Sequence, residues 1–249
     1  MRIKRFGCRT LVLTIAFSAC TKKVGQIADP YSNNTIPTPL LRQDSVSGFF
    51  IAFKNYIVVN GRYDFVDSRQ YAMLKDSLVG SGTDYIFRPS DAGRIYLNGK
   101  AMSKSADNYY SGQNYTDWPL TWSKDAGGGF DAFSCNLNIN YPQYEGAHYL
   151  PDTIRLNYPF TFMVNGTDAD SVSVHMENTG EDPHLIVKKT KPDVIVRFTE
   201  DELNLLSSFG NTPVEMLLEL SKVEYKVCGG KSYKFKTGIY IQKHITIVK

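Results

Sequence analysis

The start of this sequence lacks an apolar run long enough to cross a membrane. Its apolar run, Leu11–Ala19, has nine residues, whereas a helix needs about 20 to span roughly 30 Å of hydrocarbon. The run also lacks turn signals and alternating polar residues, so a buried strand is not indicated. These two absences exclude a transmembrane helix and a core strand at this position.

The short motifs that mark common enzymes are also missing. The sequence contains no G-x-S-x-G, H-E-x-x-H, P-loop or G-x-G-x-x-G, so no nucleophile elbow, zinc helix or phosphate loop is indicated. The stretch AGGGF at residues 126–130 has no Lys-Ser/Thr after it, and we predict a flexible turn there. We therefore predict a protein that is not an enzyme and that binds no cofactor.

Metal-ligating residues are few and scattered. The four histidines are far apart and none has ligand spacing; they are His148, His175, His184 and His244. Asp168 and Asp170 alternate in NGTDADS, but the glycine and glutamate of an EF-hand loop do not follow. We predict a hairpin turn at Asn165-Gly166 and no metal site.

The chain after the N-terminal segment has almost no net charge. The formal charge is +3, and four of the basic residues precede the apolar run: Arg2, Lys4, Arg5 and Arg9. Without them the charge is −1, from 24 basic and 25 acidic residues. A near-neutral chain gives no reason to expect nucleic acid as a partner.

What is present at the N-terminus is the pattern of a secretory signal: a basic front, a short apolar middle and small residues. Ser18-Ala19 directly precedes Cys20, and FSAC resembles a bacterial lipobox in which Phe17 replaces the commonest leucine. The resemblance implies that residues 1–19 are a signal peptide and that Cys20 is lipidated. Acyl chains contribute about 0.8 kcal/mol per buried CH₂, so several chains anchor a protein stably.

A tether follows the expected lipid anchor. Residues 20–44 contain three prolines and a cluster of Asn and Ser, which disfavour regular structure. As a flexible coil this segment would extend about 25–30 Å from the membrane. We place a first β-rich lobe at 45–150 and a second at 151–249.

The folded part is predicted to be mainly β. GFFIAFKNYIVV is rich in strand formers, while SVSVHM and DVIVRF alternate. Hairpin signals occur at Asn60-Gly61, Asn98-Gly99 and Asn165-Gly166, and a turn is expected at Gly229-Gly230. Many short strands with frequent turns favour two antiparallel, Ig-like β-sandwich lobes. Residues 67–78 fit either a helix or a long strand.

One short helix is indicated near residues 200–209. Thr199 is a good N-cap and Glu202 stands three residues later, which makes a capping box. Glu200 and Asp201 favour the positive end of the helix dipole, and Gly210 can end the helix. The capping interpretation accounts for all three acids without a catalytic or metal site.

Cys135 and Cys228 are the cysteines that remain after processing. An oxidising compartment permits a disulfide, but the two residues fall in the two different lobes that we expect. We therefore predict that they are unpaired and at least partly buried. A disulfide between them is the alternative.

The candidate binding residues are aromatic. The stretch NYYSGQNYTDWPLTW at 108–122 holds both tryptophans of the chain among amides and an acid. Flat aromatic faces stack on sugar rings and amides bind hydroxyls, so a glycan site is one interpretation; core packing is the one we favour. The candidates are Tyr109, Tyr110, Tyr115, Trp118 and Trp122.

Several segments in this order resemble a group of uncharacterised cell-envelope lipoproteins common in Bacteroidota. They are AGRIYLNG, TDWPLTWS, FDAFSCNLNINYP, DSVSVHM, TEDELNLL and GGKSYKF, within residues 48–249. The resemblance implies two β-sandwich-like lobes and an outer-membrane location, but no activity. Acidic residues after the lipidated cysteine mark surface export in many such proteins, and here Lys22 and Lys23 follow. The periplasmic face and the cell surface therefore both stay open.

The sequence thus predicts a lipid-anchored envelope protein that serves as a non-catalytic binding or accessory module, with a glycan or an envelope protein as ligand. One alternative is a structural or adhesive component that self-associates. Another is an envelope hydrolase without a recognisable motif.

Overall fold

The computed structural model describes residues 46–79, 86–113, 118–178, 184–207 and 212–248. These residues are mainly strand, as the alternating patterns predict. The strands of the first half are β1 (Gly48–Val59), β2 (Arg62–Val79), β3 (Ile86–Pro89), β4 (Ile95–Leu97), β5 (Lys100–Ala101), β6 (Ser103–Lys104), β7 (Tyr110–Gln113), β8 (Thr121–Lys124) and β9 (Phe133–Asn136). The later elements are η2 (Gly146–Tyr149), β10 (Thr153–Arg155), β11 (Phe160–Met163), β12 (Ser171–Asn178), β13 (Leu185–Thr190), β14 (Ile195–Phe198), α1 (Glu200–Leu206), β15 (Thr212–Cys228) and β16 (Lys231–Val248).

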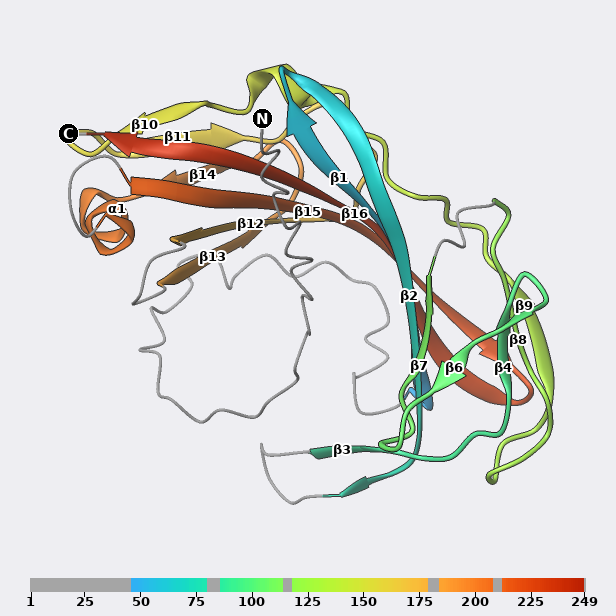
Figure 1. The fold of residues 1–249 in the computed structure, drawn as a ribbon. Helices are drawn as coiled ribbons and strands as arrows, with labels where there is room; N and C mark the ends of the chain where they lie inside the picture. The colour runs from blue at the N-terminus through green and yellow to red at the C-terminus, as the bar shows by residue number, and fades with distance from the viewer. Residues whose placement is uncertain (1–45, 80–85, 114–117, 179–183, 208–211, 249) are drawn as a thin grey trace, which may run out of the picture. The chain divides into compact units, whose positions relative to one another are not determined.

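A ten-stranded mixed sheet forms the main body of this fold (Figure 1). Its strand order is β13-β12-β15-β16-β1-β2-β7-β6, with β10 paired to β16 and β3 paired to β2. The long strands β15 and β16 are antiparallel, whereas β1 runs parallel to β16. A four-stranded sheet, β5-β4-β8-β9, and a two-stranded sheet, β11-β14, complete the described strands.

The central sheet takes strands from both sides of residue 150. The parallel pairing of β1 with β16 joins the beginning of the folded chain to its end, through a register that includes Phe50 opposite Phe235 and Lys54 opposite Ile239. The mainly β class is as predicted. The finer prediction of two Ig-like lobes is not confirmed, because one large sheet contains strands from both expected lobes. Such long-range pairing leaves no signal in local patterns.

The core lies on one face of the large sheet and has two covers. At one end the four-stranded sheet covers it, where Trp122 and Phe133 pack against Phe50 with ring centroids 5.1 and 5.8 Å apart. At the other end α1 and the β11-β14 pair cover it, with buried Phe198, Leu203 and Leu206. Residues 137–145 connect β9 to η2 between these covers, and Leu137, Tyr141 and Tyr144 are buried there.

Two of the three predicted Asn-Gly hairpins are confirmed. Asn60-Gly61 joins β1 to β2 and Asn98-Gly99 joins β4 to β5, each with positive φ at both residues. These are the angles that a two-residue type I′ turn requires. The hairpin predicted at Asn165-Gly166 is wrong, because the preceding strand β11 pairs with the distant β14. The Gly229-Gly230 turn joins β15 to β16 as expected.

The helix prediction is confirmed, with an earlier end than expected. Thr199 caps α1: its side chain accepts a hydrogen bond from the Glu202 backbone N–H, and the Glu202 carboxylate accepts one from the Thr199 N–H. The helix ends at Leu206, and Ser207 is its C-cap. Residues 208–209 of the predicted range lie outside the described residues. The ambiguous segment 67–78 is strand, within β2.

The prediction that Cys135 and Cys228 are unpaired is wrong. They form a disulfide whose Cα atoms are 6.3 Å apart, and both are buried, as expected. The error follows from the expected separation of lobes: β9 lies against the end of β15, so cysteines 93 residues apart in sequence meet in space.

The signal peptide 1–19, Cys20 and the tether 20–44 lie outside the described residues. No helix within the described part of the chain is long and apolar enough to cross a membrane.

Candidate functional site

The structure separates the five aromatic candidates of residues 108–122. Trp122, on β8, is fully buried and packs against Phe50. Tyr110, on β7, is 1% exposed, and its hydroxyl donates to the Gly93 carbonyl and accepts from the Ala92 N–H. Both side chains are part of the core, so neither presents a surface to a ligand.

Trp118 has the opposite environment. It is 43% exposed and lines a pocket of about 330 Å³. Tyr109 is half-buried and is not part of this pocket, and Tyr115 lies outside the described residues. Of the four candidates that the structure describes, Trp118 alone lines this pocket.

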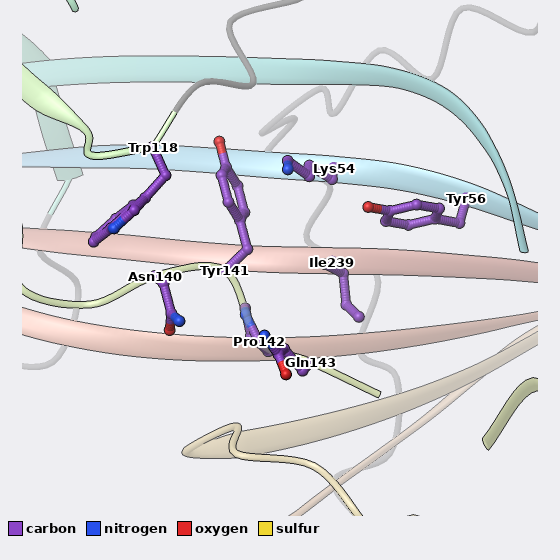
Figure 2. A pocket seen from close by; sticks show the side chains of 8 residues that line it. All are labelled: Lys54, Tyr56, Trp118, Asn140, Tyr141, Pro142, Gln143 and Ile239. Carbon is purple, nitrogen blue, oxygen red and sulfur yellow. The ribbon is translucent and has the colours of Figure 1, made fainter. Parts of the chain in front are cut away.

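The Trp118 pocket combines aromatic rings, amides and one charged group. Figure 2 shows Trp118, Tyr141, Lys54 and Tyr56 in a row across the strands, with Asn140, Pro142 and Gln143 beside them. The lining residues are Lys54, Tyr56, Trp118, Asn140, Tyr141, Pro142, Gln143 and Ile239.

Strand alternation explains the floor and one side of this pocket. Side chains of a strand alternate between faces, so Lys54 and Tyr56 share the face of the core residues Phe50 and Ala52. On the neighbouring strand, Ile239 is the partner of Lys54 in the parallel register. The core face of the sheet therefore continues past the cover formed by Trp122 and becomes the base of the pocket.

Hydrogen bonds fix the segment Asn140–Gln143 against the sheet. The Thr237 hydroxyl donates to the Asn140 carbonyl at 2.8 Å, and the Lys222 ammonium donates to Asn140 Oδ1 at 2.7 Å. The Asp168 carboxylate accepts from the Gln143 N–H at 2.9 Å and also pairs with Lys222. These contacts hold an otherwise irregular segment in place, so this side of the pocket is fixed.

A second pocket of about 280 Å³ adjoins the first. It shares Tyr56, Pro142, Gln143 and Ile239 with the Trp118 pocket. Its further lining residues are Tyr63, Tyr144, Glu145 and Ile241. We call the two pockets together the aromatic groove.

Burial favours the neutral form of two phenols in the groove, and the charged residues that line it are few. Burial raises the pKa of Tyr56, and it raises the pKa of Tyr144 to about 12. The Lys54 ammonium lies 4.5 Å from the centroid of the Tyr141 ring, a favourable cation–π distance. Lys54 lines the Trp118 pocket and Glu145 lines its neighbour.

No group of three or more His, Cys, Asp or Glu residues that could hold a metal is present in the described ranges. The two acids of NGTDADS have structural partners instead: Asp168 holds Gln143 and Lys222, and Asp170 accepts from the Val223 N–H at 2.8 Å. The Nε2 atom of His175 lies 3.7 Å from Oε2 of Glu219. The side chain of His148 is outside the described set.

Sequence reasoning missed most of the groove. The alternation in FIAFKNYIVV does place Lys54 and Tyr56 on one face, and NINYPQYEG is rich in tyrosine and amides. Neither pattern indicates that the two segments meet. No family model, curated protein or solved structure matches this chain.

Proposed function

We propose that this chain is a glycan-binding module of the bacterial cell envelope and that the aromatic groove is its ligand site. The observation that carries the proposal is the exposed Trp118 in a pocket that is also lined by two amides, Asn140 and Gln143, and two phenols, Tyr56 and Tyr141. Aromatic faces pack against the CH groups of sugar rings, while amides and phenols bind hydroxyls. Ligand sites commonly have this composition, an apolar lining with a few oriented polar groups.

The proposed location follows from the lipobox-like sequence at Cys20 and from the resemblance to envelope lipoproteins. The Cys135–Cys228 disulfide supports it, because disulfides persist in oxidising compartments outside the cytoplasm. On this proposal, lipid on Cys20 anchors the module to the outer membrane and the tether holds it away from the bilayer.

The test of the groove is Trp118→Ala in the mature protein, with binding measured on an oligosaccharide array and stability measured by thermal melting. We expect binding to weaken about tenfold or more, because truncating a central aromatic contact costs on the order of 2 kcal/mol. The free energy of unfolding should change by about 1 kcal/mol or less, since much of the side chain is already exposed.

Tyr158→Ala is the matched control. Tyr158 is 66% exposed and does not line the groove, so its loss should leave both binding and melting unchanged. Wild-type protein that binds no oligosaccharide, or a Trp118→Ala variant that binds as well as wild type, would rule out this site.

Self-association is a second candidate, suggested by β13. This strand ends the order of the large sheet and exposes Leu185 and Val187. Lys189 on this strand opposes edge-to-edge pairing, however; it is exposed, and so is Lys191 directly after the strand. Sedimentation over a range of protein concentrations distinguishes an oligomer from a monomer.

A further inference from the structure

Lys54 is a half-buried cation within the groove, and the described part of the chain places no acidic partner beside it. Its ammonium packs over Tyr141, and it makes no ion pair with any residue that the structure describes. Two other lysines near this part of the sheet are paired: Lys222 with Asp168 and Lys236 with Glu219. A half-buried ammonium without a carboxylate leaves a positive site for a ligand.

The rest of the Trp118 pocket adds donors rather than acids. The Oδ1 atom of Asn140 already accepts from Lys222, which leaves its NH₂ group to donate to a ligand. Among the residues that the structure describes, no Asp or Glu lines this pocket, and Glu145 lies in the adjoining one. The pocket is therefore complementary to a group that is anionic and accepts hydrogen bonds.

We infer that the Trp118 pocket binds the carboxylate of an acidic sugar, a hexuronic acid unit of an oligosaccharide. Lys54 is the charge partner, the Asn140 amide donates to the same unit, and Trp118 stacks on the sugar ring. The second pocket, which contains Glu145, receives a neighbouring neutral part of the chain. This inference rests on the proposed glycan-binding function and specifies its ligand class.

The experiment compares ligands that differ only in charge. Short oligomers of galacturonate, glucuronate and mannuronate are each measured against their own methyl esters by calorimetry, with the mature protein. We expect wild type to bind at least one free acid about tenfold more tightly than its ester, the effect of one charge-assisted contact. Raising ionic strength from about 0.05 to about 0.5 M should reduce this preference several-fold.

Lys54→Met removes the charge and keeps a similar apolar stem. This variant should lose the preference for acid over ester, measured as the ratio of its own affinities for the two ligands. Lys189→Met is the matched control: Lys189 is exposed on β13, an edge strand, and lies on the opposite face of the sheet from Ile239. It should keep the full preference. If the methionine variant has a lower melting temperature than wild type, Lys54→Gln replaces it in the same comparison.

The outcomes separate the two proposals. Wild type that binds neutral oligosaccharides or the esters as tightly as the acids would overturn the acidic-sugar inference alone. A Lys54→Met variant that keeps the acid preference would do the same. Absence of binding to any acid, ester or neutral oligosaccharide would overturn the glycan-binding function as well.

Discussion

At the scale of single residues, Glu219 is a charged side chain in an unusually covered position. It lies on β15, its side chain is 13% exposed, and its neighbours are Lys236 and His175. Burial alone would raise the pKa of Glu219, but these two neighbours outweigh burial and lower the pKa to about 2. The ionised form is thus favoured in the folded state over the unfolded one, where the value is about 4.5.

Glu219→Gln tests this linkage. A lowered folded-state pKa contributes stability above the unfolded value, and this contribution is lost as pH falls from about 4.5 toward about 2. At pH 7 the variant should lose up to about 3 kcal/mol of unfolding free energy. The difference from wild type should shrink steadily below about pH 4.5, as measured by denaturant titration at several pH values.

Glu215→Gln is the control for that experiment. Glu215 lies on the same strand and the same face, two alternations from Glu219, and makes no ion pair within the described ranges. Its substitution should have a small effect. A Glu219→Gln effect that is the same at pH 7 and at pH 3 would contradict the linkage.

The two tryptophans show how little local sequence decides at this scale. Trp118 and Trp122 are four residues apart, yet one is 43% exposed and the other is fully buried. Trp122 is on β8, where alternation directs it toward Phe50, whereas Trp118 precedes that strand. This difference in exposure depends on where β8 begins and on which strand packs over β8.

At the scale of elements, the disulfide joins β9 of the small sheet to the end of β15 in the large sheet. It closes a loop of 93 residues, and such cross-links contribute about 2–4 kcal/mol, largely by restricting the unfolded chain. Reduction, or the double change Cys135→Ser with Cys228→Ser, should lower the melting temperature by about 5–15 °C.

Thiol counting in denaturant without reductant supplies the control for the disulfide. Each single serine variant should release one free thiol relative to wild type, and the double variant none. Melting that is insensitive to reductant would show that the cross-link does not stabilise the fold.

The helix and the tight turns were the elements most accessible to prediction. Thr199 and Glu202 contact each other within one turn, so the capping box needs no distant partner. Asn60-Gly61 and Asn98-Gly99 likewise determine their own backbone angles. Asn165-Gly166 has positive φ at its glycine, but a favourable turn does not make the flanking segments pair with each other.

At the scale of the whole molecule, the lipid anchor proposed at Cys20 would determine where the groove is presented. If Cys20 is lipidated, Cys20→Ser should leave the precursor uncleaved or without acyl chains and should move the protein out of the detergent phase, because the acyl chains supply the membrane affinity. Detergent partitioning and intact mass measure this. Wild type that stays in the aqueous phase with no acyl mass would exclude the anchor.

The sequence by itself determined the features whose physics is local. Alternation in segments such as SVSVHM predicts strands because side-chain direction repeats every two residues. Capping boxes and Asn-Gly turns depend on contacts within a few residues, whereas the signal peptide and the lipidation of Cys20 stay predictions. The mainly β class and the short helix followed from these features.

The tertiary structure alone decided which strands pair and what lies on each face. The parallel register of β1 with β16 brings Lys54 opposite Ile239, and the bonds from Thr237 and Lys222 bring Asn140 beside them. These contacts join residues that are 82 to 185 positions apart, and their energy depends on burial and register across the whole sheet. No local pattern encodes that register, so the aromatic groove and the Cys135–Cys228 pairing became visible only when the chain was folded.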